Sequence, residues 1–275
     1  MLDDIDRDYE DFEEEWPEGY PRDKVVDQAK EALEEFFRAN DEDVFYMQQL
    51  EVFFEKQFFH WITSRAINEL IGEGRLKAEE HPLLGPTRAK FVRDKAHRYH
   101  KLQIREKLKV VREYSNPTIT EACGRQAEML FFNSLTNKGF ISQGQDTNEY
   151  KGRKWEETDH NLDFIVERDS KVYGTEVKNK WSYIDSDELD IKLAICDHLG
   201  IKPLFIMRGS PKHYNNMIYE AGGYAMIFVC QIYPFGQRDL VARIREKLGL
   251  EADCPRAIPD GIIDRFMRWH DSQKP

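Results

Sequence analysis

The chain has 275 residues, of which 33% are charged and 40% hydrophobic, a length that suits one large domain or two ordinary ones. Seventeen Phe, twelve Tyr and five Trp provide ample core material, which excludes wholesale disorder. There is no run of about 18 apolar residues and no basic start followed by an apolar stretch, so we expect neither a membrane span nor a signal peptide. We therefore expect a cytoplasmic protein. The four cysteines form no C-x-x-C pair and are expected to be buried, reduced thiols.

The net charge of −11 is unevenly distributed along the chain. Residues 1–60 hold twenty acidic and six basic residues, a net of −14, which leaves +3 for the rest. Within that rest, residues 61–113 hold thirteen basic and seven acidic residues, a net of +6. Because phosphate binding depends on local potential, the acidic whole-chain charge does not exclude a nucleic-acid partner. Residues 1–20 are predicted to be an acidic flexible tail or, alternatively, a DNA mimic that screens a basic groove.

The segment 21–115 has the element order of a winged helix-turn-helix. Helical spacing begins at Val25, a second helix is expected to open at Asp41 and a third spans about 58–73; two short strands follow, near Arg75 and Ala89. The third helix resembles winged-helix recognition helices, which place outward side chains in the DNA groove. The alternative is a protein-protein module. The predicted DNA contacts are Ser64, Arg65 and Asn68 on the helix, Arg75 and Lys77 on the first strand, and Arg88, Lys90 and Arg93 on the wing.

A second domain is expected over 116–275, because Pro117 disfavours helix at Asn116 and ends a basic helix over 95–113. From there helices alternate with strands. The expected helices cover 121–138, 186–199, 211–220 and 238–248, and the expected strands cover 140–143, 161–167, 172–179, 203–207 and 225–229. The order αβββαβ, followed by αβ, predicts an α/β fold with a mixed sheet covered by helices on both faces.

Two neighbouring strands carry charged residues inside apolar segments. Asp163 lies in the first, and Glu176 and Lys178 share one face of the second. Such charges are expensive to bury unless they are paired or bound to a metal, and carboxylates are suitable ligands for Mg²⁺. The chain has four acidic-x-Lys triplets, which end at Lys151, Lys171, Lys178 and Lys192. Only the third lies in a strand that follows another strand with its own acid.

Glu128 lies on the helix over 121–138, beside apolar positions at i+3, i+4 and i+7. A carboxylate on this apolar stripe needs a partner of opposite charge, and a metal bound at the neighbouring strands would be one. The alternative is that Glu128 is a surface residue that faces outward. Asp159 is a rival for the acid role but precedes the strand. His160 is expected to be a structural or substrate-contact residue, and Lys180 is placed to contact the scissile phosphate.

The combination of Gly124–Glu128, Gly139-Phe, Leu162-Asp163 and Gly174–Asn179 resembles the PD-(D/E)XK, or restriction-endonuclease-like, superfamily. In spacing it is nearest to archaeal Holliday-junction resolvases and Mrr-type restriction nucleases, over Thr118 to Val229. The resemblance implies that Mg²⁺ or Mn²⁺ is bound by Glu128, Asp163, Glu176 and the Val177 carbonyl, and that Lys178 assists the attacking water. The chain departs from the family pattern at Leu162, where the motif has proline.

We therefore expect a metal-dependent endodeoxyribonuclease acting on duplex or branched DNA. A homodimer is one way to cut both antiparallel strands. One alternative is a catalytically silent winged-helix regulator that uses the nuclease fold as a binding module. Another is a structural ion-pair network formed by Asp163, Glu176 and Lys178. The sequence has no P-loop, G-x-S-x-G or H-E-x-x-H motif.

Overall fold

The computed structural model describes residues 24–273, which form two compact units. The first contains residues 24–119 together with Ala242–Leu250, and the second contains Thr120–Val241 and residues 251–273. The sequence assigned 242–250 to the second domain, whereas this segment packs in the first unit. The expected acidic tail, residues 1–20, lies outside the described residues. Within the described part of the chain, no helix is long and apolar enough to cross a membrane.

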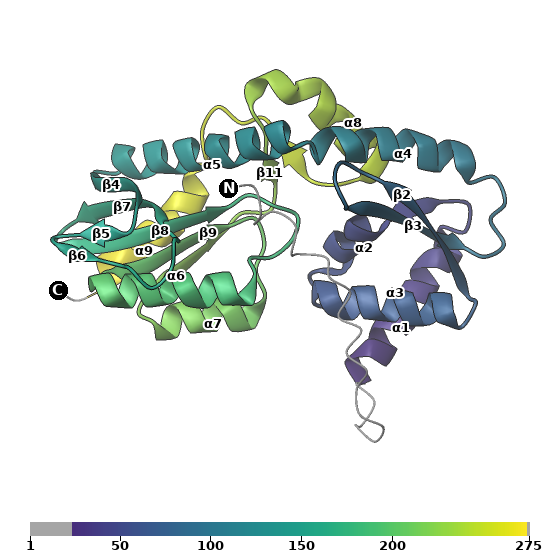
Figure 1. Ribbon diagram of the computed structural model, residues 1–275, viewed down its shortest axis with the longest axis horizontal. Coiled ribbons are helices and arrows are strands. Elements are labelled where there is room, and N and C mark those ends of the chain that lie inside the picture. The colour runs from purple at the N-terminus through teal and green to yellow at the C-terminus, as the bar shows by residue number, and fades with distance from the viewer. Residues whose placement is uncertain (1–23, 274–275) are drawn as a thin grey trace. The chain divides into compact units, whose positions relative to one another are not determined.

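The first unit combines helices with a three-stranded antiparallel sheet of order β1-β3-β2 (Figure 1). Its core is built from aliphatic and aromatic side chains of α1, α2, α3 and the sheet. The elements are α1 (Lys24–Ala39), β1 (Val44–Tyr46), α2 (Met47–Phe54), α3 (His60–Gly72), β2 (Leu76–Pro82), β3 (Arg88–Asp94) and α4 (Lys101–Tyr114). The three helices α1, α2 and α3 precede the ribbon β2–β3, and the strand β1 lies between α1 and α2.

Strand β1 is a correction to the sequence analysis, which expected a helix to open at Asp41. Val44, Phe45 and Tyr46 are all buried and pair with β3, so the helix begins three residues after the strand does. The backbone N–H of Tyr46 donates to the Gln49 side chain, 3.1 Å away, at the start of α2. Three residues carry too little periodicity to be recognised as a strand. Pairing with β3 determines their conformation.

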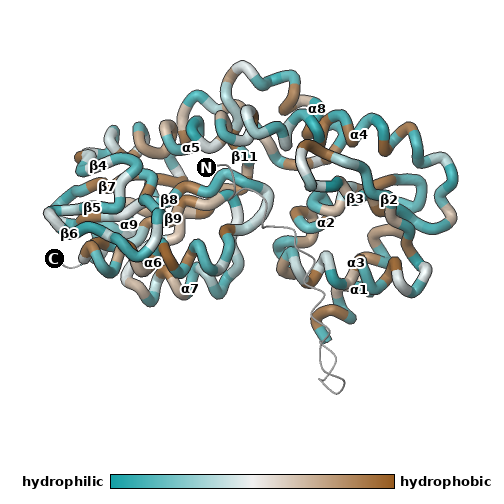
Figure 2. Tube along the Cα trace, in the orientation of Figure 1, coloured by the Kyte–Doolittle hydropathy of each residue, from teal (hydrophilic) through white to brown (hydrophobic). Residues whose placement is uncertain are grey.

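Helix α4 is hydrophilic over most of its length, with hydrophobic positions at intervals (Figure 2). Its buried side chains include Ile104, Leu108 and Val111, which lie on one side of the helix. The two acidic residues of α4 pair with basic residues of α8 (Arg238–Leu248): Glu113 with Arg243 and Glu106 with Lys247. These ion pairs accompany the packing of 242–250 in the first unit.

The second unit is a mixed five-stranded sheet of order β10-β9-β8-β7-β4 (Figure 1). The pairs β4–β7 and β7–β8 are antiparallel, and β8–β9 and β9–β10 are parallel. The strands are β4 (Ile141–Thr147), β7 (Leu162–Arg168), β8 (Lys171–Lys178), β9 (Lys202–Met207) and β10 (Tyr224–Ile227). Smaller elements are β5 (Glu149–Tyr150), β6 (Arg153–Lys154), β11 (Gln231–Ile232), η1 (Phe235–Gln237) and β12 (Ala252–Asp253). The prediction of a mixed α/β sheet is confirmed.

Helices cover both faces of this sheet. Side chains of α5 (Pro117–Asn137) and α9 (Asp260–Ser272) pack on one face against alternate residues of β7 and β8. Side chains of α6 (Ser186–Leu199) and α7 (Lys212–Glu220) pack on the other. All four cysteines lie in this unit, none of them forms a disulfide, and three of them are buried. Helix α9 is the one long element of the unit that the sequence analysis missed.

The hairpin β7–β8 aligns the two strands that carry the predicted site. Its turn residues Asp169 and Ser170 both have positive φ (51° and 61°), the geometry typical of a two-residue hairpin turn. The turn fixes the register, in which Phe164 pairs with Thr175. A Cβ on Gly174 would lie 2.7 Å from Leu162 Cδ1 and 2.8 Å from Cys196 Sγ, so glycine here lets α6 approach β8 closely.

His270 joins α9 to the turn end of the same hairpin. Its ring is fully buried, with Nδ1 2.8 Å from the Tyr173 hydroxyl and Nε2 3.2 Å from Asp169 Oδ2. Burial lowers the pKa of His270 below its ordinary value of 6.5, although Asp169 acts in the opposite direction. The folded protein therefore favours neutral His270.

We predict a pH dependence of stability that originates at His270. Near pH 6 the unfolded state takes up a proton that the folded state resists, so the free energy of unfolding falls as the pH drops through about 6.5. In His270→Gln the protein should be less stable at neutral pH, because the buried ring is lost, but its stability should decline less on acidification. Thermal unfolding of both proteins at successive pH values measures this difference. If the stability of the two proteins declined equally with falling pH, His270 would not be the origin of the pH dependence.

Candidate active site

The β7–β8 hairpin brings Asp163 next to Glu176. The pairing of the hairpin extends to Phe164 opposite Thr175, and Asp163 and Glu176 are the next residues on the two strands. The backbone N–H of Val177 donates to Asp163 Oδ2, 2.6 Å away. This bond fixes the Asp163 carboxylate beside β8. The two predicted acids of the strands are thus neighbours.

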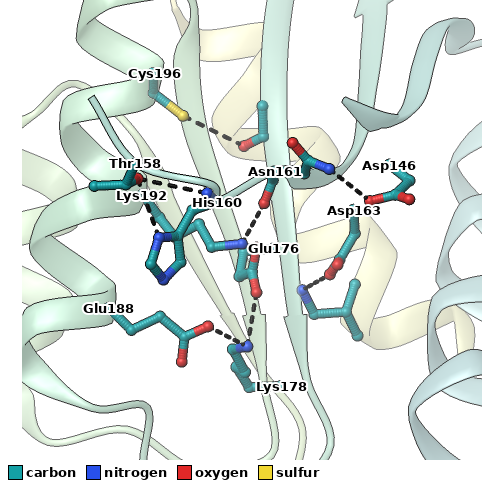
Figure 3. Close-up of polar contacts among 12 residues, drawn as sticks. Asp146, Thr158, His160, Asn161, Asp163, Glu176, Lys178, Glu188, Lys192 and Cys196 are labelled. Carbon is teal, nitrogen blue, oxygen red and sulfur yellow. Dashed lines mark hydrogen bonds and ion pairs between the residues drawn. The ribbon is translucent and has the colours of Figure 1, made fainter. Parts of the chain in front are cut away.

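Glu176 is the most deeply buried carboxylate of the site, with 2% of its surface exposed. Its Oε1 lies 2.8 Å from the Lys178 ammonium, and its Oε2 lies 2.6 Å from the Lys192 ammonium (Figure 3). Lys178 also donates to Glu188 Oε1 at 2.7 Å. Burial opposes the charge of Lys178, but Glu176 and Glu188 outweigh it, so the pKa of Lys178 is raised above its ordinary value.

The contact between Lys192 and Glu176 is an ion pair without good hydrogen-bond geometry. Lys192 is buried and donates to the backbone carbonyl of Asn161. Among the described residues, Glu176 Oε2 accepts no hydrogen bond. A buried carboxylate oxygen in this state has an unused lone pair for a further ligand.

Lys192 and Glu188 are site residues that the sequence analysis missed. Lys192 ends one of the four acidic-x-Lys triplets, but it lies in the helix expected over 186–199 and not in a strand, so the sequence analysis predicted no role for it in the site. Its position held a usable signal, since Leu189 and Ile195 lie three residues to either side and both are buried. A lysine on the apolar stripe of a helix predicts a buried acidic partner.

Glu128 comes from α5 and is half-buried, as the position of the apolar stripe suggested. Burial and the nearby Glu176 both raise the pKa of Glu128, while Lys178 and Arg125 lower it. Burial, followed by Glu176 and Glu128, raises the pKa of Asp163 to about 8. The three carboxylates therefore act on one another electrostatically.

The cluster holds more acid than base. Four carboxylates, those of Glu128, Asp163, Glu176 and Glu188, surround the ammonium groups of Lys178 and Lys192. No ion pair of the described chain joins Glu128 or Asp163 to a cation. Ionising both Asp163 and Glu128 would leave two negative charges without a counter-charge in the cluster, and both groups resist this, because their pKa values are raised. A divalent cation would supply that counter-charge, and carboxylate oxygens are the ligands that Mg²⁺ and Mn²⁺ prefer.

The remaining predicted site residues have different surroundings. The side chain of Val177 packs in the core, so only its backbone faces the site. Lys180 is exposed just beyond β8, and Asp159 is exposed in the loop before β7. His160 Nδ1 lies 3.1 Å from Thr158 Oγ1, the hydroxyl to which Trp155 also donates. His160 thus takes part in holding that loop.

Most of the predicted DNA contacts of the first unit have acidic partners. Arg65 pairs with Glu69 at 3.3 Å and Arg88 with Glu80 at 3.1 Å. The further contacts are Ser64 with Glu51, Lys90 with Asn68 and Glu80, and Arg75 with Glu34 and Glu73. Lys77 is exposed and has no partner in the described part of the chain.

Arg93 departs from the expectation that it decorates the wing. It is buried, and its guanidinium donates to the carbonyls of Asp94 (3.2 Å) and His97 (2.8 Å). It lies 3.6 Å from Glu79 as well. On a strand whose neighbouring residues Phe91 and Val92 are also buried, the arginine stabilises the turn after β3 and does not face solvent.

A different group in the second unit, Asp169, His270 and Asp271, has its potential ligand atoms within 4.8 Å of one another. It lies at the turn end of the hairpin, whereas Asp163 and Glu176 lie near the opposite end. Both ring nitrogens of His270 already have partners. Among the described residues, the potential ligand atoms of Glu128, Asp163 and Glu176 do not all lie within 4.8 Å of one another, so binding one ion through all three requires side-chain rotation.

Comparison with protein-family models, with curated proteins and with solved structures found no match to this chain.

We predict that Lys192 and Glu176 are energetically coupled. Lys192→Met should destabilise the second unit by about 3 kcal/mol, because it removes one cation from a buried carboxylate while Lys178 remains. Adding Glu176→Gln should recover much of this loss, since the uncompensated charge is removed. Adding Glu149→Gln, on the exposed hairpin β5–β6, should recover nothing. Chemical denaturation of the single and double variants tests this, and additive effects of Lys192→Met and Glu176→Gln would contradict it.

Proposed function

We propose that the protein is a metal-dependent nuclease that hydrolyses phosphodiester bonds in DNA, with its active site at Glu128, Asp163, Glu176 and Lys178. The observation that carries the proposal is the excess of carboxylate over ammonium groups in one cluster. The order αβββαβ and the mixed sheet are those expected of the PD-(D/E)XK superfamily, which supports the proposal. The element order of the first unit supports the winged-helix part of the hypothesis in the same way.

The residues fit a divalent cation by their chemistry. Glu176 has a buried oxygen that accepts no hydrogen bond, and Asp163 and Glu128 have no cationic partner among the described residues. These three side chains, with the Val177 carbonyl, would hold Mg²⁺ or Mn²⁺. Once bound, the ion would supply Lewis acidity toward a phosphate oxygen and a more acidic water.

The chain's own groups have defined roles in hydrolysis. In the reaction a water oxygen bonds to phosphorus, the bond to one ester oxygen breaks, and that leaving oxygen takes up a proton. Lys178 is positioned by Glu188 and Glu176, so its ammonium is held at the site and can offset the negative charge that grows on the phosphoryl oxygens. Lys180, exposed beyond the end of β8, is available to contact a neighbouring phosphate.

A purely structural ion-pair network is the alternative that the contacts favour most. Lys178 and Lys192 do pair with Glu176, as such a network requires. A structural network does not explain why Asp163 and Glu128 lie near these ion pairs but form none themselves among the described residues. A metal site explains both carboxylates.

We predict metal-dependent cleavage of plasmid, linear duplex or four-way junction DNA that stops in EDTA. Glu176→Gln and Lys178→Met should each reduce cleavage by about a hundredfold or more. Glu149→Gln and Lys151→Met, which alter an exposed triplet of the same acidic-x-Lys type, should cleave normally and serve as matched controls. Lys178→Met should still bind DNA in EDTA with an affinity within a few-fold of the unmodified protein.

The alternatives give different results in the same experiment. A silent DNA-binding regulator would bind these substrates and cut none of them. A structural network would gain no thermal stability from Mn²⁺, whereas a carboxylate site gains stability by mass action and loses that gain in Glu176→Gln. Absence of both cleavage and stabilisation would contradict the nuclease proposal.

A further inference from the structure

Helix α4 presents a row of basic side chains that the predicted DNA contacts do not include. We call Lys101, Arg105, Lys109 and Arg112 the α4 basic stripe; all four are exposed. Their spacings of 4, 4 and 3 residues place them within an arc of about 80° on the helix. They extend over about 16 Å of helix length at 1.5 Å per residue.

The stripe keeps its positive charge because the acids of α4 have other partners. Glu113 forms two contacts of 2.6 Å with the Arg243 guanidinium, and Glu106 lies 3.4 Å from the Lys247 ammonium. Lys101, Arg105 and Lys109 form no ion pair with any described residue. Arg112 donates to the carbonyl of Pro82, which positions its guanidinium and leaves its charge uncompensated.

The surface predicted from the sequence has the opposite character. On α3 and the wing, Arg65, Arg75 and Arg88 each pair with a glutamate. Arg93 is buried. A polyanion approaching that surface would have to displace these glutamates, whereas the α4 basic stripe has no acid to displace. The local charge therefore favours the binding of a polyanion at α4 over its binding at α3 and the wing.

The form of the stripe fits a regular row of phosphates better than a lipid surface. The apolar side of α4, which includes Ile104, Leu108 and Val111, is buried and cannot enter a bilayer as an interfacial helix does. A row of about 16 Å is long enough to reach several phosphates of a duplex, in which each strand carries one negative charge per about 3.4 Å of helix axis. The exposed aromatic ring of Tyr99, 88% accessible, lies just before the stripe.

We propose that the α4 basic stripe, and not α3 or the wing, is the surface of the first unit that holds the phosphate backbone of duplex DNA. The choice of DNA rests on the proposed function; the preference for a phosphate backbone rests on the stripe itself. Because backbone contacts carry no base readout, the first unit would bind DNA with little regard to sequence.

The test compares two pairs of charge removals in the full-length protein by fluorescence anisotropy with a labelled duplex. EDTA is present throughout, so binding is measured without cleavage. Arg105→Gln/Lys109→Gln should weaken binding at least tenfold at about 0.1 M salt and reduce the salt slope by about two. Arg65→Gln/Arg88→Gln removes two charges from α3 and the wing and should leave both quantities unchanged.

One further variant and two further ligands complete the test. Arg105→Lys/Lys109→Arg preserves charge and should bind DNA as the unmodified protein does; a loss of binding here would overturn the proposal, as would equal or greater weakening by Arg65→Gln/Arg88→Gln. Anionic vesicles or duplex RNA that bind the stripe more tightly than DNA would overturn it as well. Stripe-dependent binding without any cleavage would support this inference while the nuclease proposal failed. Cleavage by a protein whose DNA binding is unchanged in the stripe variants would support the nuclease proposal and overturn this inference.

Discussion

The burial of the Glu176 carboxylate constrains the second unit more than any other single feature. An ion removed from water to this extent costs several kcal/mol unless opposite charges surround it, and here Lys178 and Lys192 lie within 2.8 Å of its two oxygens. Lys192 comes from α6, so that helix must lie close to β8. Gly174 permits this approach, because a side chain there would collide with Leu162 and Cys196. Charge compensation and close packing are thus parts of one arrangement.

The same arrangement determines what the site can do. The lysines balance Glu176 and Glu188, while Asp163 and Glu128 form no ion pair with a described residue. Burial, Glu176 and Glu128 raise the pKa of Asp163, and burial and Glu176 raise the pKa of Glu128. A divalent ion would relieve this repulsion and would compete with the lysines for the oxygens of Glu176. Lys178 would then be freed in part from its ion pair, close to where a phosphate would lie.

Much of the second unit could be predicted from the sequence, because its signals are local. Helix α6 has the bounds predicted for it, set by an Asp185 cap and by Gly200 with φ +69°. The hairpin turn and the alternation in β7 and β8 placed Asp163 near Glu176. Lys192 was missed because its partner lies on a distant strand, and β1 because its conformation depends on β3. The pairing of Arg65 with Glu69 is an i,i+4 contact within α3 and could have been predicted from the spacing, whereas the pairing of Arg88 with Glu80 depends on the register of β2 with β3.

The most direct test of a metal at Glu176 is anomalous X-ray scattering from a crystal of the full chain soaked in Mn²⁺. The account predicts a peak about 2 Å from carboxylate oxygens of Asp163 and Glu176, with the Lys178 ammonium displaced from its ion pair. A peak confined to Asp169, His270 and Asp271, or no peak at a concentration that supports cleavage, would contradict it.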